Sequence, residues 1–156
     1  MANYEIERKF LVDLDRLDQE LSSAAHRLIQ QGYLAISPEG NEVRLRRQND
    51  QFLLTVKSGG DLQREEREIE LSEPQFDALW PATDGRRVEK TRYIIPYGES
   101  VIELDVYDGA LTGLVTAEVE FATVEASNGF QPPDWFADEI TSDKRYKNKN
   151  LAQVGL

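Results

Sequence analysis

The sequence predicts a mainly β domain of the α+β class, built from about eight antiparallel strands with a few covering helices. Apolar and charged residues alternate with a period of two through most of the 156 residues, as expected for strands with two unlike faces. Turn residues such as Asn49-Asp50, Gly98 and Asp108-Gly109 separate several of these segments. The links are short, which favours antiparallel pairing because parallel strands need long crossovers. We expect one domain over residues 1–156.

The first expected elements are a strand over Asn3–Val12 and a helix from Leu14 to Gln31. In the strand, charged Glu5, Glu7 and Lys9 share one face, and apolar Ile6 and Phe10 lie on the other. In the helix, apolar residues recur at spacings of three and four, and Gly32 ends the pattern. The residues of that stripe are Leu14, Leu17, Leu21, Ala25 and Leu28. We expect this amphipathic helix to cover the apolar face of the sheet.

Seven further strands and a short second helix follow along the chain. Ser72 is a candidate N-cap, and Pro74 suits the first turn of a helix from Pro74 to Trp80. A basic helical tail is expected after Ser142. The remaining expected strands are Tyr33–Ser37, Glu42–Gln48, Gln51–Lys57, Arg64–Leu71, Arg87–Tyr97, Ser100–Asp108 and Val115–Val124.

Composition and charge exclude several classes of protein. The chain has 18 basic and 29 acidic residues, a net charge of −11, whereas nucleic-acid and anionic-membrane binding require a basic surface. The absence of cysteine excludes disulfides, thiolate metal sites and cysteine nucleophiles. The N-terminal residues are too charged for a signal peptide, and no apolar run approaches a membrane span of about 20 residues. We expect a cytoplasmic protein without nucleic-acid or membrane partners.

The polar faces of the strands carry almost only charged residues, with like charges repeated two positions apart. The pairs are Glu5/Glu7, Arg44/Arg46, Glu68/Glu70, Lys90/Arg92, Glu103/Asp105 and Glu118/Glu120. Like charges on one face repel, so such repetition is a poor choice for stability alone. Paired carboxylates suit a divalent cation, and paired bases suit phosphate oxygens. The pattern therefore predicts a cavity for a metal–polyphosphate complex, inside a barrel with a charged lumen. The alternative is an ordinary sandwich or half-barrel whose charged face lies in water.

These residues also stand in the order of a known family signature. Glu5-x-Glu7-x-Lys9, followed by Phe10-Leu11-Val12, resembles the signature of the CYTH superfamily, the triphosphate tunnel metalloenzymes. Further matching segments are Gln31-Gly32-Tyr33-Leu34, Val43-Arg44-Leu45-Arg46, Thr55-Val56-Lys57-Ser58-Gly59, Arg67-Glu68-Ile69-Glu70, Lys90-Thr91-Arg92-Tyr93, Glu103-Leu104-Asp105-Val106-Tyr107, Glu118-Val119-Glu120, and Asp143-Lys144-Arg145-Tyr146 with Asn148. The resemblance covers about residues 3 to 152. It implies a closed, eight-stranded antiparallel tunnel.

The resemblance also implies site residues, carried over position by position. The residues implied to hold phosphate are Arg44, Arg46, Lys57, Lys90 and Arg92, with Lys9 near the reacting group and Lys144 and Arg145 in a lid or plug. Glu5, Glu7, Glu118 and Glu120 are implied to place Mg²⁺ or Mn²⁺, while Glu68, Glu70, Glu103 and Asp105 complete the acidic lining or orient water. For activating the water we favour the metal with Glu5 or Glu7. Lys90 with Tyr33 is the alternative base.

The expected reaction is the hydrolysis of inorganic tripolyphosphate. The predicted lining residues account for the phosphates and the metal, and no further residues stand out as able to recognise a nucleobase. A nucleoside or thiamine triphosphatase and a class IV adenylate cyclase are the alternatives that share the signature. A non-catalytic polyphosphate-binding module is the alternative from another class, and a homodimer is left open. His26, Phe76, Trp80 and Trp135 are interpreted as structural or solvated residues.

Overall fold

The computed structural model describes residues 6–59 and 64–154, whose nine strands form one antiparallel sheet in the order β5-β4-β3-β2-β6-β7-β8-β1-β9. The strands are β1 (Ile6–Val12), β2 (Ala25–Ile36), β3 (Glu42–Gln48), β4 (Gln51–Gly59), β5 (Arg64–Glu70), β6 (Arg87–Tyr97), β7 (Ser100–Tyr107), β8 (Val115–Phe121) and β9 (Phe136–Glu139). The predicted class, mainly antiparallel β with few helices, is confirmed. The eight predicted strands are present within β1–β8, and β9 was not predicted.

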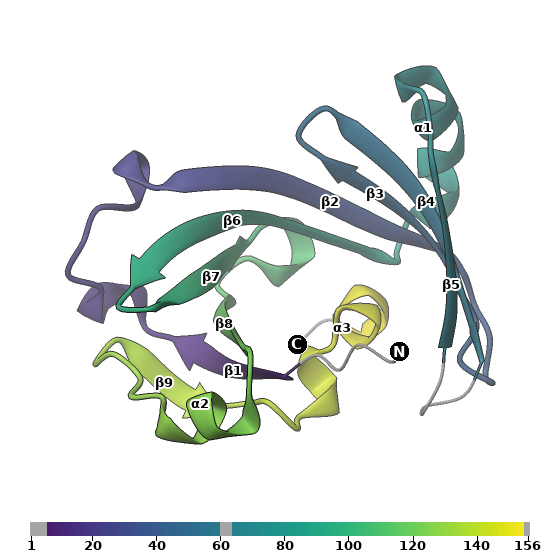
Figure 1. The fold of residues 1–156 in the computed structure, drawn as a ribbon. Helices are drawn as coiled ribbons and strands as arrows, with labels where there is room; N and C mark the ends of the chain where they lie inside the picture. The colour runs from purple at the N-terminus through teal and green to yellow at the C-terminus, as the bar shows by residue number, and fades with distance from the viewer. Residues whose placement is uncertain (1–5, 60–63, 155–156) are drawn as a thin grey trace.

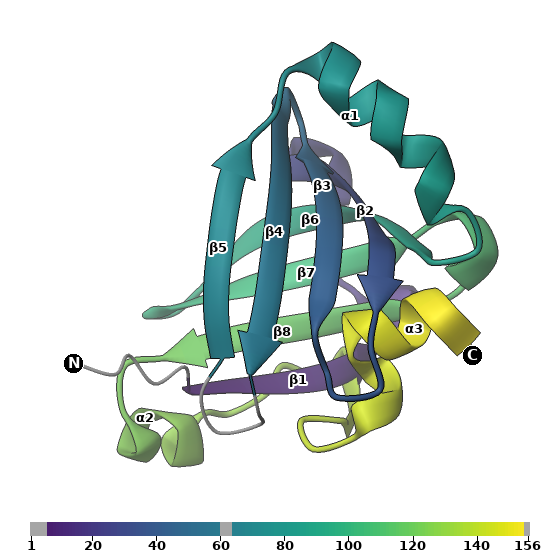
Figure 2. The same cartoon turned by 90° about the vertical axis from the view of Figure 1, so that its right-hand side faces the viewer.

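The sheet bends so that its two halves lie across from each other (Figure 1). Strands β2, β3, β4 and β5 make one wall, seen face-on in Figure 2, and β6, β7, β8 and β1 cross behind it. Within the described residues, strand pairing ends at β5 on one side and at β9 on the other. Closure of the predicted barrel therefore stays a prediction.

The helix predicted from Leu14 to Gln31 is wrong. The chain makes 3₁₀ turns at η1 (Leu14–Arg16) and η2 (Leu21–Ser23) and then enters β2, which pairs with β3 on one side and β6 on the other. These two neighbours satisfy the backbone groups of β2, so tertiary pairing outweighs the helical spacing of the leucines. Leu17 and Leu21 still pack against the core, whereas Leu28 is 60% exposed.

The helices that do form are short. They are α1 (Glu73–Leu79), α2 (Val124–Gly129) and α3 (Asn148–Val154), with further 3₁₀ turns η3 (Trp80–Thr83), η4 (Gly109–Leu111) and η5 (Lys144–Tyr146). Helix α1 confirms the predicted second helix: the Ser72 hydroxyl accepts from the Gln75 backbone N–H, and the Gln75 side chain accepts from the Ser72 N–H. None of the helices in the described segments has the length and apolar character needed to cross a membrane.

Apolar side chains from the outer faces of the strands form two of the three cores. Phe10, Leu104 and Val119 pack with Phe130 and Trp135, so α2 and the segment after it provide the cover that was predicted for a long helix. On the other wall, α1 places Phe76 on Leu45 and Phe52 of β3 and β4. The third cluster holds α3 by Leu151 against Tyr33 and Tyr107. The charged strand faces are thereby left on the inside of the bend.

Gly32→Ala is expected to destabilise the fold by about 1–3 kcal/mol. An added Cβ at Gly32 would lie 2.6 Å from both Cβ and Oγ1 of Thr83. Thr83 cannot yield readily, because it is fully buried, donates to the Trp80 carbonyl at 2.7 Å and accepts from Arg87 Nε at 2.9 Å. Urea unfolding measures the effect. Gly129→Ala, where nothing lies within 4 Å of the added Cβ, is the control expected to change stability by under about 0.5 kcal/mol.

Candidate active site

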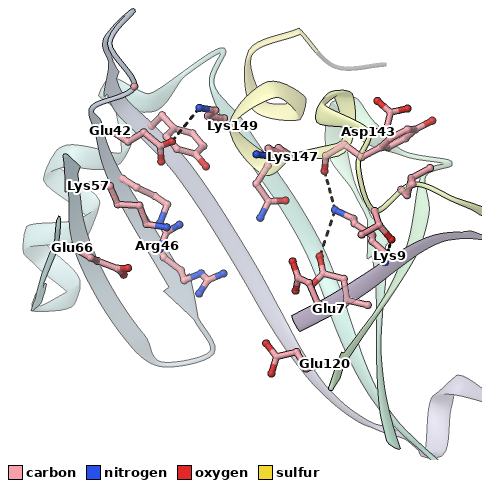
Figure 3. Close-up of a pocket in the computed structure, with 18 of the residues that line it drawn as sticks. Glu7, Lys9, Glu42, Arg46, Lys57, Glu66, Glu120, Asp143, Lys147 and Lys149 are labelled. Carbon is pink, nitrogen blue, oxygen red and sulfur yellow. Dashed lines mark hydrogen bonds and ion pairs between the residues drawn. The ribbon is translucent and has the colours of Figure 1, made fainter. Parts of the chain in front are cut away.

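A cavity of about 680 Å³ lies between the two walls of the bent sheet. Its lining is almost entirely charged or polar, and it combines residues from β1, β3, β4 and β8 with the segment before α3 (Figure 3). The lining residues are Glu7, Lys9, Tyr33, Glu39, Gly40, Glu42, Arg44, Arg46, Lys57, Glu66, Arg92, Glu118, Glu120, Ile140, Thr141, Asp143, Tyr146, Lys147, Asn148 and Lys149. The charged faces expected on β1, β3, β4 and β8 contribute to this lining, whereas Lys90, Glu103 and Asp105 of the faces expected on β6 and β7 do not border it.

One wall of the cavity is basic. Arg44 and Arg46 project from β3, and Lys57 follows on the neighbouring strand β4. The Nε atoms of Arg44 and Arg46 are buried and lack a hydrogen-bond partner within the described chain. Burial, reinforced by the charge of Arg44, lowers the pKa of Arg46. Buried donors without partners are costly, and anionic oxygens are the ligands that would satisfy them.

The opposite wall carries carboxylates on β1 and β8. Glu7 lies directly across the ladder from Glu120, and Lys9 lies directly across from Glu118. Lys9 Nζ is 3.5 Å from a Glu118 oxygen, so one of these acids is already paired with a base. Like-charged residues that face each other across a ladder repel, so the pairing of Glu7 with Glu120 does not by itself stabilise the sheet.

The donor set fits a hard divalent cation that shares its coordination with substrate. Across residues 6–59 and 64–154, no group of three or more His, Asp or Glu side chains is arranged to hold a metal ion by itself. Mg²⁺ is commonly held by one or two carboxylates together with waters and substrate phosphate oxygens. Glu7, Glu118 and Glu120 supply such carboxylates and border the cavity.

A buried ion-pair cluster lies on β6 and β7 beside the cavity. Lys90 Nζ is 2.8 Å from Asp105 Oδ2, and Arg92 donates from Nε and Nη2 to the two Asp105 oxygens at 2.8 and 2.9 Å. Burial lowers the pKa of Lys90, against the opposing effect of Asp105. Burial would raise the pKa of Asp105, but the hydrogen bonds from Arg92 and the charge of Lys90 hold it below its usual range. Asp105 and Arg92 are therefore charged at neutral pH.

The segment around η5 and α3 contacts both walls at one end of the cavity. Lys9 Nζ donates to the Tyr146 carbonyl at 2.8 Å, and Lys149 Nζ is 3.8 Å from Glu42 (Figure 3). Lys147 and Lys149 border the cavity and were not predicted as site residues. The sequence feature that could have indicated them is the basic run from Lys144 to Lys149. Such a run can also serve only to offset the negative end of a helix dipole.

The structure brings together most of the predicted site residues. Those that border the cavity are Glu7, Lys9, Tyr33, Arg44, Arg46, Lys57, Arg92, Glu118 and Glu120. Those that lie outside its lining are Glu68, Glu70, Lys90, Glu103, Asp105, Lys144 and Arg145. Glu5 lies outside the described residues. Burial raises the pKa of Tyr33, whose hydroxyl accepts from Gln31 Nε2 at 3.0 Å, so the phenol is neutral near pH 7.

Comparisons with known proteins agree with this geometry. A family model described as "CYTH domain" matches residues 3–155. A Nitrosomonas europaea protein named inorganic triphosphatase is 50% identical over 150 residues, which cover 95% of this chain and 96% of that protein. An Acetivibrio thermocellus protein of the same name is 35% identical over 151 residues, which cover 96% and 93% respectively. A crystal structure of an inorganic triphosphatase matches with a TM-score of 0.83 at 45% identity, covering 97% of this chain and 96% of that one. Because the family model matches residues 3–155 and the fold is shared, the chain belongs to the CYTH domain family, the metal-dependent triphosphate tunnel metalloenzymes.

Proposed function

We propose that the protein hydrolyses inorganic tripolyphosphate with the aid of a divalent metal ion, Mg²⁺ or Mn²⁺. The observation that carries the proposal is a cavity whose basic wall faces the carboxylates of Glu7 and Glu120. On that wall the Nε atoms of Arg44 and Arg46 have no hydrogen-bond partner among the residues that the structure describes. Basic groups suit the phosphate oxygens of a metal–triphosphate complex, and carboxylates suit its metal ion. The two relatives named inorganic triphosphatase support the same substrate for this chain.

The residues divide the chemistry between the two walls. Arg44, Arg46 and Lys57 bind and align the phosphates, which is most of what phosphoryl transfer requires of a protein. Glu7 and Glu120, with Glu118, would hold the metal. When bound, such an ion neutralises charge on phosphate oxygens and lowers the pKa of a coordinated water. Lys9 stands beside Glu118, where its ammonium can meet the reacting phosphate.

The cavity offers little for recognising a nucleobase. Tyr33, Ile140 and Tyr146 are the aromatic or large apolar residues of its described lining, and Tyr33 is only 2% exposed. Stacking surfaces and apolar contact are the usual means of holding a base. This supports inorganic tripolyphosphate over ATP or thiamine triphosphate as the preferred substrate.

A substrate panel tests the proposal. Phosphate release is measured from tripolyphosphate, ATP and thiamine triphosphate, each with Mg²⁺, with Mn²⁺ and with EDTA. We expect tripolyphosphate to give a kcat/KM at least about tenfold above the others and EDTA to abolish release. Higher kcat/KM for a nucleotide would overturn the substrate assignment. Calorimetric binding of tripolyphosphate without release under any metal would make the protein a binding module instead.

A further inference from the structure

Asp105 is the shared partner of two cations beside the cavity. Its Oδ1 accepts from Arg92 Nε, and its Oδ2 accepts from both Arg92 Nη2 and Lys90 Nζ, all within 2.9 Å. The β6–β7 register places Asp105 directly opposite Arg92, which allows the side-on, two-bond contact between carboxylate and guanidinium. Both carboxylate oxygens are thus engaged by bases that are themselves at least partly buried.

This geometry leaves Asp105 unsuited to holding a metal ion. The residue is 1% exposed and does not border the cavity, whereas Glu7, Glu118 and Glu120 do. Ligating a metal would require it to break with Arg92 and Lys90, leaving two buried cations without their counter-ion. Leaving buried charges without their counter-ion in this way costs several kcal/mol of stability.

Arg92 is the group through which Asp105 reaches the substrate. The Arg92 side chain is 16% exposed and borders the cavity, and its third nitrogen, Nη1, is 2.6 Å from Glu103. Without Asp105, neither Nε nor Nη2 would have its present partner, and the guanidinium could turn toward the carboxylates of the acidic wall. Glu118, 3.9 Å from Nη2, is the nearest of these.

We propose that Asp105 is a positioning residue, which fixes Arg92 for phosphate binding and takes no part in holding the metal. The proposal rests on the proposed function and deepens it. The short aspartate side chain matters for this role, because it holds the carboxylate directly opposite Arg92 on β6. A glutamate at this position would carry the carboxylate one methylene further and so displace it from its present contacts with Arg92 and Lys90.

Steady-state kinetics of Asp105→Asn separate the two roles. We expect the KM for tripolyphosphate to rise about 10- to 100-fold, the equivalent of one charge-assisted hydrogen bond. The metal concentration that gives half-maximal rate should stay within about twofold of wild type. A rise in that metal concentration with an unchanged KM would overturn the proposal. Asp108→Asn, an exposed aspartate just past the end of β7, is the matched control, with both constants unchanged.

A binding measurement without metal provides a readout that does not depend on turnover. In EDTA, tripolyphosphate should raise the melting temperature of wild type and of Asp108→Asn, and raise that of Asp105→Asn by less. An equal rise in Asp105→Asn would overturn the positioning role. Failure of wild type to respond would instead count against the phosphate-binding wall, and so against the proposed function itself.

A double-mutant cycle distinguishes positioning from general loss of structure. In an Arg92→Met background, Asp105→Asn should change KM by no more than about twofold, because the residue through which it acts is gone. If both substitutions lower the melting temperature but their effects on KM simply multiply, Asp105 does not act through Arg92 and the proposal fails. Asp105→Glu should restore stability more than KM, since it returns the charge but not its position.

Discussion

Replacing Glu120 by glutamine is expected to lower kcat by at least about 100-fold while leaving the melting temperature unchanged or raised. Glu120 borders the cavity and faces Glu7 across the β1–β8 ladder. A glutamine keeps the size of the side chain but replaces a carboxylate oxygen by an amide that binds divalent cations less well. It also removes one of two like charges that face each other, which relieves repulsion in the ladder. Glu7→Gln is expected to behave in the same way.

The measurements are kcat at saturating tripolyphosphate, the half-saturating metal concentration, and the melting temperature by calorimetry. The half-saturating metal concentration should rise in both variants. Glu99→Gln, an exposed glutamate in the turn between β6 and β7, is the control that should match wild type in all three. A fall of several degrees in melting temperature together with wild-type kcat would show that these carboxylates serve as structural ion pairs.

The alternation of charged and apolar residues predicted most of the sheet and the direction of its faces. β3 and β6 have the bounds predicted for them; Arg44 and Arg46 of β3 and Arg92 of β6 line the inside as expected, whereas Lys90 does not border the cavity. Alternation succeeds here because strand side chains point to opposite faces with a strict period of two. The order of the strands in the sheet and the bend that forms the cavity depend on long-range pairing, which local periodicity does not contain.

The wrong helix shows where local spacing fails. The leucines at 14, 17 and 21 have helical spacing, yet the chain there forms two isolated turns and then a strand. Helix propensity is a weak influence, and two strand neighbours along β2 supply more hydrogen bonds and packing than a surface helix would. α2 and β9 were missed because six- and four-residue elements carry too few periods to be read from a sequence.

The inward face of a strand was predictable, but the partner of each charge on that face was not. Glu118 and Asp105 both belong to charged faces, yet one borders the cavity and the other is closed off by two cations. Glu42 lies on the charged face of β3 and is 4% exposed beside Lys149, which is more than 100 residues away in the chain. Contacts of this kind arise only from the folded arrangement, so the resemblance to a family could assign Asp105 to the acidic lining but could not give its partners.

The ratio of kcat/KM for wild type to that for Lys90→Met is expected to fall as pH rises. The Lys90 ammonium contacts Asp105, lies beside Arg92, and has a pKa held below the usual 10.5 by burial. If Lys90 contributes its positive charge to phosphate binding, its advantage is complete below this lowered pKa and is lost as pH passes through it. A lysine acting as a general base would show the opposite sign, because only the neutral amine accepts a proton.

The ratio also removes titrations that both proteins share, including that of any metal-bound water, and thereby isolates the lysine. Below its pKa, Lys90→Met should lower kcat/KM by about 100-fold, the order expected for losing one charge of the buried cluster that Lys90 forms with Asp105 and Arg92. Tyr33→Phe should keep the wild-type slope, because the Tyr33 hydroxyl accepts from Gln31 and its raised pKa keeps it neutral. A ratio that rises with pH, together with a large loss in Tyr33→Phe, would establish the Lys90–Tyr33 pair as the base. A falling ratio leaves the activation of water to the carboxylate wall and its metal.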